Sequence, residues 1–434
     1  MTDRTASAGV ALTLTDVARV QRRTVGVLSA AQVLGGIAFG ATISLGAVLA
    51  AEISGDETFS GLAAAAVTFG TALIAIPLAA LARRRGRRVS LATGMIAALV
   101  GVVLVVIATG SRSFPLLLLA FLLIGGGQAA NLQSRFAAAD LATDASRGRD
   151  LSIVVWATTI GAVLGPNLTG PGEILGEAIG MPPLTGPYLF TIVGQFLGIL
   201  LYLVALRPDP LLTAQRVVAE ASTGATRQLI AKPDQPRIAR YAIFAVASAH
   251  GVMVAVMAMT PVHLLHHGAT LTIIGVTLSL HIAGMYALSP VFGILADRLG
   301  RIPTILIGQV LIAAALVTVS FGQDSTLAVT IGLTILGLGW SATTVAGSTL
   351  LTEASAEARR TRRQGLSDFT MSMVGAVGAI LAGVILGWIG YGGLALLVGV
   401  AVVAVIALAF LGRASGSEDK AETEGDADGV GAQQ

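Results

Sequence analysis

Residues 293–302 of this chain read GILADRLGRI, and residues 79–88 read AALARRRGRR. The two segments agree at a constant offset of 214 residues, as Gly86 against Gly300 shows. The residues that match are Leu81, Ala82, Arg84, Gly86 and Arg87 in the first copy and Leu295, Ala296, Arg298, Gly300 and Arg301 in the second. A loop repeated at one offset indicates two copies of a larger structural unit in one chain.

The composition places both units in a membrane, because 54% of the 434 residues are hydrophobic and only 12% are charged. Apolar runs of about 20 residues recur along the chain, and each can cross a bilayer core as a helix. We therefore expect an all-α membrane protein with twelve transmembrane helices in two six-helix halves. The expected spans are 24–51, 59–82, 89–109, 114–135, 151–171, 187–206, 238–262, 271–296, 302–322, 325–350, 367–389 and 391–412.

The basic residues orient these spans. With the N-terminus inside, all of the 27 Lys and Arg residues except Arg112 fall on the cytoplasmic side, as the positive-inside rule requires. We expect a multi-pass protein of the cytoplasmic membrane with both termini in the cytoplasm. Its expected parts are a cytoplasmic leader (1–23), an N-terminal half (24–206), a cytoplasmic linker (207–237), a C-terminal half (238–413) and a disordered cytoplasmic tail (414–434).

The repeated loop has the residue types of a gate between the halves. Gly293 permits close helix contact, and the carboxylate of Asp297 near a helix end can pair with arginine across the halves. The first copy departs from this pattern, because Ala79 and Arg83 stand where the second has Gly293 and Asp297. The expected gate residues are Gly293, Asp297, Arg298, Gly300, Arg301, Arg84 and Arg87. The alternative is that the arginine clusters only set the topology.

Both copies resemble the loop signature G-x-L-A-D-R-x-G-R-[KR] of the major facilitator superfamily. That resemblance implies the major facilitator fold of 6+6 helices and a secondary carrier whose halves rock about a site near the membrane midplane. It also implies a transporter and not an enzyme.

Methionine and histidine gather in residues 250–285, which hold all five histidines of the chain. His250, Met253 and Met257 share one face of the seventh span, and His281 and Met285 share one face of the eighth. Thioether and imidazole ligands without a carboxylate suit Cu(I). Packing is the alternative, because methionine often fills gaps between helices.

At these residues the chain resembles the CcoA-like copper importers, which carry M-x-x-x-M on span 7 and H-x-x-x-M on span 8. The resemblance implies copper import through Met253, Met257, His281 and Met285, with His250 as an auxiliary ligand or proton acceptor. Related carriers with similar hairpins transport organic solutes such as riboflavin. The alternative is therefore a proton-coupled carrier, in the direction of efflux, of a small organic compound or drug, with His281 as the titrating group.

Residues 161–171, GAVLGPNLTGP, resemble the span 5 signature of drug/proton antiporters of the superfamily. Gly161 and Gly165 form a small-residue packing face, and Pro166 loosens the helix, so we expect a hinge there. Uncharged polar residues also lie deep in the spans, and we expect them to bridge helices more than to bind substrate. They are Gln32, Gln128, Asn131, Asn167, Gln195 and Gln309.

Several kinds of chemistry are excluded. The chain has no cysteine, so it forms no disulfide and no thiolate metal site. It has no G-x-x-x-x-G-K-[ST] loop, so this chain alone is not expected to pump with ATP. We expect a monomer in the lipid bilayer with a small-molecule or metal-ion substrate, with proton coupling open, and with no cofactor and no nucleic acid. A metal-binding receptor that moves nothing is a third alternative.

Overall fold

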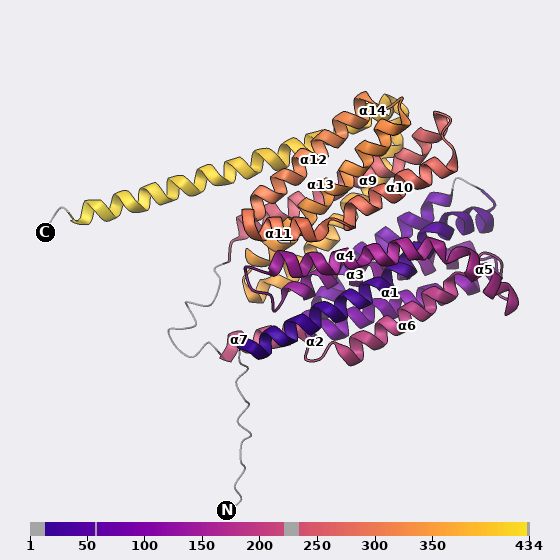
Figure 1. Cartoon of the computed structure of the whole chain (residues 1–434), viewed down its shortest axis with the longest axis horizontal. Coiled ribbons are helices and arrows are strands. Elements are labelled where there is room, and N and C mark those ends of the chain that lie inside the picture. Colours follow the sequence, from indigo (N-terminus) through magenta and orange to yellow (C-terminus); the bar gives the residue numbers. More distant parts are fainter. Residues whose placement is uncertain (1–13, 57–58, 221–233, 432–434) are drawn as a thin grey trace, which may run out of the picture.

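The computed structural model describes residues 14–56, 59–220 and 234–431, and within these ranges the chain is helical and contains no strand. One bundle is formed by helices early in the sequence: α1 (Leu14–Ser54), α2 (Ser60–Gly110), α3 (Phe114–Ala139), α4 (Arg147–Asn167), α5 (Thr169–Ala178), α6 (Tyr188–Ala205) and α7 (Pro210–Glu220). The other is formed by α9 (Pro236–His266), α10 (Leu271–Tyr286), α11 (Ser289–Leu299), α12 (Arg301–Phe321), α13 (Thr326–Glu353) and α14 (Glu357–Gly431). Figure 1 shows the two bundles one above the other.

The described helices include eight that are long and apolar enough to cross a membrane. Two of these are far too long for a single crossing, because α2 has 51 residues and α14 has 75, whereas about 20 residues span a bilayer core. Each contains a glycine with non-helical backbone angles, Gly86 in α2 and Gly390 in α14. Ser90 Oγ donates a hydrogen bond to the carbonyl of Leu78, 2.7 Å away, so the chain reverses at Gly86 and α2 is two spans.

Large apolar side chains on the outer surface are exposed, among them Phe321, Trp388 and Val400. Each bundle has its own buried apolar core, and glycines such as Gly70 and Gly125 lie where α2 and α3 approach backbone to backbone. An outer surface with exposed apolar side chains is suited to contact with lipid tails. The expectation of an all-helical membrane protein is confirmed, and the chain is a multi-pass membrane protein.

Gly86 and Gly300, the glycines of the repeated loop, have the same backbone conformation. Their φ and ψ angles are 85° and 170° for Gly86 and 98° and 164° for Gly300. This region is essentially restricted to glycine. The repeat in the sequence is therefore a repeat in the backbone, since each glycine turns the chain from one span into the next.

We predict that Gly300→Ala lowers the free energy of unfolding by about 1–3 kcal/mol, because alanine is strained at these angles. The added methyl group itself meets only the ring of Pro303, at 3.7 Å. Thermal unfolding in detergent measures the effect. The matched control is Gly275→Ala in α10, where no atom lies within 4 Å of the new methyl group and alanine favours the helix. Equal melting temperatures for the two variants would contradict the strain.

Two expected spans are interrupted in the structure. The span expected at 271–296 consists of α10 and α11, which meet around Leu288, because Pro290 lacks an N–H and disfavours helix in the residues before it. The span expected at 151–171 ends with α4 at Asn167, and α5 follows. Proline also stands near this break, at 166 and 171.

The expected disordered tail is a further difference. The structure continues α14 as a helix through Gly431, and Figure 1 shows this part projecting beyond the bundle. The tail contains no proline and follows the last span without a break in the helix. Alanine and glutamate, which favour helices, recur in it. The leader 1–23 is described only from residue 14 onward, where α1 begins.

Candidate functional site

A buried ion pair joins the two halves. Arg135 near the end of α3 donates from Nη2 to Oδ1 of Asp368 in α14 at 2.6 Å. The two side chains are 3% and 0% exposed. Neither Arg135 Nε nor Asp368 Oδ2 has a hydrogen-bond partner in the described structure. Each of these charges is therefore neutralised by the other, so both side chains must become hydrated when the halves separate here.

A second contact joins the loop of the C-terminal repeat to the N-terminal half. The carboxylate of Asp297 accepts hydrogen bonds from the backbone N–H groups of Gly148 and Arg149, both at 2.9 Å. These groups lie at the start of α4, where unpaired N–H groups and the helix dipole favour a negative charge. Gly293, one turn earlier, packs so closely that a Cβ atom would collide with Ser152 and the Gly148 carbonyl. The carboxylate therefore holds α11 against α4.

The paired arginines of the repeat, Arg87 and Arg301, have matching environments. Arg301 forms two hydrogen bonds with Glu353, at 2.7 and 3.0 Å, and a third at 2.7 Å with the carbonyl of Asp144 in the other half. Arg87 forms two with Asp140, at 2.8 and 3.2 Å, and a third at 2.6 Å with Gln364 Oε1 in the other half. Each arginine thus binds a carboxylate of its own half and reaches across to the other.

The repeat is not symmetric throughout. Arg83, which occupies the position of Asp297 in the first copy, is exposed, as are Arg84 and Arg298. Arg84 and Arg298 were expected to be gate residues, but neither makes one of the contacts between the halves described above. The start of α14 is held instead by Asp234, which accepts from the N–H of Ala356 at 3.1 Å and from Arg363 at 2.7 Å. The Ala356 N–H and the Arg363 side chain hold the pKa of Asp234 below its ordinary value.

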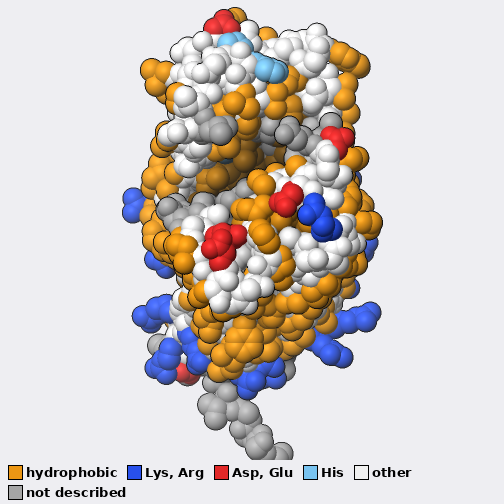
Figure 2. All heavy atoms as spheres, turned by 90° about the vertical axis from the view of Figure 1, so that its right-hand side faces the viewer, with side chains coloured by type: hydrophobic (Ala, Val, Ile, Leu, Met, Phe, Trp, Pro, Cys, Tyr) orange, Lys and Arg blue, Asp and Glu red, His pale blue; other side chains and the backbone are white. Residues whose placement is uncertain are grey.

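These contacts gather at one end of the molecule, which we call the arginine-rich end: the end with the exposed Arg83, Arg84, Arg85, Arg149, Arg298 and Arg359. Figure 2 views the opposite end, where a hollow lies between the two halves. The halves are therefore joined at the arginine-rich end and parted at the other.

The methionines and histidines expected to bind metal lie in the C-terminal half. Met253 and Met285 are buried in one apolar cluster, and Met257 packs against it. His281 is fully buried. Its Nδ1–H donates to the carbonyl of Leu333 at 2.7 Å, and its Nε2 has no hydrogen-bond partner among the described residues. No group of three or more His, Asp or Glu side chains able to hold a metal occurs in the part of the chain that the structure describes.

His250, the expected auxiliary ligand, has a different environment. The indole N–H of Trp340 donates to His250 Nδ1 at 3.1 Å, so the lone pair of that nitrogen is already used. The expected hinge lies on α4, where Gly161 packs so closely that a Cβ atom would meet the Val33 carbonyl and Gly36 of α1. The side chains at 165 and 166, the other two hinge residues, lie outside the described residues.

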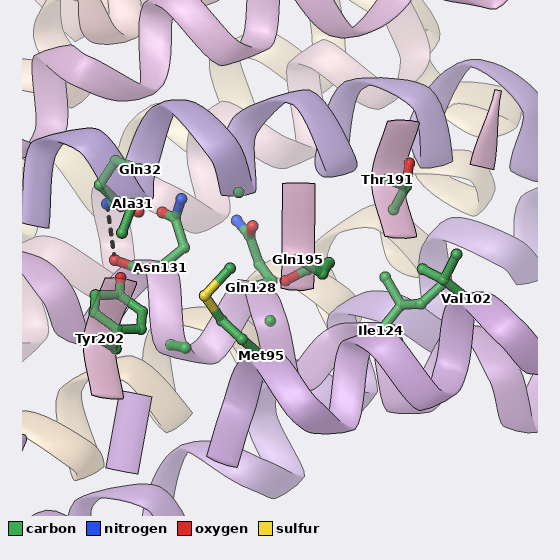
Figure 3. Close-up of a pocket in the computed structure, with 13 residues that line it drawn as sticks. Ala31, Gln32, Met95, Val102, Ile124, Gln128, Asn131, Thr191, Gln195 and Tyr202 are labelled. Carbon is green, nitrogen blue, oxygen red and sulfur yellow. Dashed lines mark hydrogen bonds between the residues drawn. The ribbon is translucent and has the colours of Figure 1, made fainter. Parts of the chain in front are cut away.

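A polar crevice inside the N-terminal half was not expected. Four carboxamide side chains line it, those of Gln32, Gln128, Asn131 and Gln195, which come from α1, α3 and α6 (Figure 3). Its cavity volume is about 20 Å³, which is room for about one water molecule. Gln32 Nε2 donates to the backbone carbonyl of Asn131 at 3.1 Å, so this glutamine bridges two helices. Gln195 is 4% exposed, and no residue in the described part of the chain forms a hydrogen bond with its Oε1.

Comparisons with known proteins agree with this architecture. The chain matches the family model of the Major Facilitator Superfamily over residues 28–280 and again over 241–432. It is 35% identical to the MFS-type transporter YddS of Bacillus subtilis (strain 168) over 372 residues, which cover 85% of each chain.

Two further proteins are similar. The riboflavin transporter RfnT of Brucella anthropi is 29% identical, with 86% of this chain and 92% of RfnT covered. The crystal structure of the human organic anion transporter MFSD10 shares the fold, with a TM-score of 0.70 at 15% identity over 90% of this chain and 99% of that one. None of these names mentions copper, so the expected relation to copper importers has no support from them. Members of this family are transporters and not enzymes, and the chain belongs to the major facilitator superfamily.

Proposed function

We propose that this transporter carries an uncharged organic solute, and that its arginine-rich end faces the cytoplasm. The observation that carries the proposal is the distribution of buried charge. The buried Arg and Asp side chains of the described residues lie toward the arginine-rich end: Arg87, Arg135, Asp140, Arg147, Asp150 and Asp368. The crevice farther inside is lined by carboxamides and apolar side chains, without a charged one. A charged solute bound farther from the arginine-rich end would have no buried Arg or Asp of the described residues as a counter-ion.

The relatives support an organic solute as well. RfnT transports riboflavin, as its name states, and riboflavin has a large uncharged heterocycle with hydrogen-bonding groups on its edge. The positive-inside rule supports the orientation, because the basic loops gather at one end. We propose that the carrier works as a monomer in the cytoplasmic membrane, with proton coupling to be settled by the assay below.

Copper import is the second candidate, and one observation favours it. The hydrogen bond to the Leu333 carbonyl fixes the tautomer of His281, so its buried Nε2 carries a lone pair that no described residue engages. Met285 lies one helical turn away. Against this, Met253 and Met285 pack among apolar side chains such as Leu336, which is the ordinary role of methionine.

Uptake into proteoliposomes separates the two candidates. The purified full-length protein is tested with riboflavin, with a permanently charged dye and with ⁶⁴Cu under reducing conditions, each with and without an imposed pH gradient. We expect saturable riboflavin uptake above that of empty liposomes and no uptake of copper or dye. Copper uptake that Met257→Ala/His281→Ala abolishes would overturn the organic-solute proposal, as would transport of the charged dye alone.

A further inference from the structure

A second cavity lies in the C-terminal half, at the end of the molecule opposite the arginine-rich end. Its volume is about 440 Å³. The residues that line it include His263, His266 and His267 at the end of α9, and Gln323 and Asp324 in the turn between α12 and α13. Figure 2 shows histidine side chains on the surface of this end, next to an acidic one. These residues take no part in the contacts between the halves described above.

The hydrogen bond of His267 fixes which of its ring nitrogens carries a lone pair. Its Nδ1 lies 2.9 Å from the backbone carbonyl of His263. A carbonyl oxygen only accepts hydrogen bonds, so Nδ1 carries the hydrogen, and Nε2 of the neutral ring carries the lone pair. A hydrogen bond from one ring nitrogen to a backbone carbonyl is also the usual arrangement that orients a metal-binding histidine.

A carboxylate lies beside this nitrogen. Asp324 Oδ1 is 3.4 Å from His267 Nε2, and both atoms are acceptors when the ring is neutral. Two acceptors this close repel each other unless a cation lies between them. A shared proton would give a charged hydrogen bond, which is shorter, about 2.7–2.9 Å. Two ligand atoms on one tetrahedral zinc ion, each about 2.0–2.1 Å from the metal, lie roughly 3.3 Å apart. The observed separation therefore matches a shared metal ion better than a shared proton.

We propose that His267 Nε2 and Asp324 Oδ1 bind a divalent transition-metal ion, and that zinc is the ion that fits this ligand pair. Imidazole and carboxylate are both ordinary zinc ligands, whereas Mg²⁺ and Ca²⁺ prefer oxygen ligands alone. A third His, Asp or Glu is not in place among the described residues. His266 is exposed and lines the same cavity, so it is available as a further ligand after rotation of its side chain, and water completes the coordination.

The bound ion links the turn between α12 and α13 to the end of α9. Both elements belong to the C-terminal half, so the ion stabilises the outer end of that half without joining it to the other. The site therefore goes beyond the proposed transport function and does not depend on the identity of the transported solute.

Isothermal titration of the purified full-length protein with zinc sulfate tests the site. The protein is prepared without a histidine tag and titrated at about pH 8, where exposed histidines are neutral. We expect one zinc ion to bind per chain and an excess of Mg²⁺ not to displace it. The absence of saturable zinc binding would overturn the proposal.

Variants locate the bound ion. We expect His267→Ala and Asp324→Asn each to weaken zinc binding at least about tenfold, since even the loss of a group that orients a ligand costs roughly 10- to 100-fold. The matched control is Glu52→Gln, because Glu52 is also an exposed acidic residue but lies at the end of α1 in the other half. We expect this control to leave the affinity unchanged. Full zinc affinity in either of the first two variants, or an equal loss in the control, would refute the site.

A further variant separates a metal site from an ordinary ion pair. Asp324→His removes the negative charge but keeps an atom that binds zinc, and the side chain of Asp324 is 88% exposed, so the replacement does not disturb buried packing. We expect Asp324→His to bind zinc at least about tenfold more tightly than Asp324→Asn. An ion pair with His267 would be lost equally in both variants. Equal zinc affinities for the two would therefore show that residue 324 does not bind the ion.

Discussion

Arg135→Ala is expected to open the arginine-rich end and to destabilise the conformation in which the halves are joined there by about 3–5 kcal/mol, the usual cost of removing one partner of a buried ion pair. Asp368 would remain fully buried without the hydrogen bond that Arg135 donates, and no other donor to its side chain occurs among the described residues. Conformations in which water reaches Asp368 would then be favoured. The effect is large because Asp368 is fully buried and its Oδ2 has no hydrogen-bond partner among the described residues.

Thiol labelling measures this opening. The chain has no cysteine, so Ser367→Cys introduces a single thiol at a position that is 1% exposed in the joined conformation. We expect maleimide to label this thiol slowly in the otherwise wild-type protein and at least about tenfold faster after Arg135→Ala, since each 1.4 kcal/mol is a factor of ten in the equilibrium.

The control removes both charges. Arg135→Met combined with Asp368→Leu fills the space with apolar side chains, and such replacements of buried pairs are often neutral or stabilising. We expect this double variant to label as slowly as the wild type and to melt at least as high. Fast labelling in the double variant would show that the ion pair is not what protects the thiol.

The sequence predicted the membrane architecture well because hydropathy, helix length and loop charge each constrain it independently. The interruptions at Leu288 and Leu168 were missed because a local break does not change the mean hydropathy of a span. The repeated loop led to Asp297, Gly293 and Arg301, since their spacing relative to the helix ends is the same in both halves. Their positions agree with contacts between the halves, although the role of gate remains a proposal.

Other site features could not be read from the sequence. Arg135 and Asp368 each lie at the edge of an expected span, where charges are common, and their pairing depends on how two distant helices pack. Gln195 was expected to bridge helices, as Gln32 does. Which amide finds a partner depends on helix rotation, and hydrophobic periodicity is weak in helices that are apolar on all sides. Figure 3 shows that carboxamide side chains from three helices line the same crevice, which the sequence pattern did not reveal.

Asp297→Ala is the second large change, and it tests the contact between α11 and α4. The variant loses two hydrogen bonds from a charged carboxylate to the start of a helix. Hydrogen bonds to charged groups contribute about 1.5–3 kcal/mol each, and the helix dipole strengthens them. Because water replaces part of this interaction once the halves separate, we expect a net shift of about 2–3 kcal/mol toward the open arginine-rich end, or roughly 30- to 150-fold.

The same Ser367→Cys reporter measures this shift, and Arg298→Gln is the matched control. Arg298 adjoins Asp297 in the repeated loop but is exposed, so its loss should leave the labelling rate unchanged. If Asp297→Ala labels no faster than Arg298→Gln, the carboxylate does not hold the halves together. In that case Arg301, which also binds Asp297 at 3.2 Å and reaches the carbonyl of Asp144, would have to carry the contact. If Asp297→Ala labels fast and Arg298→Gln does not, the aspartate of the C-terminal copy holds the halves together. The first copy has Arg83 at this position and needs no aspartate, because Asp234 holds the start of α14.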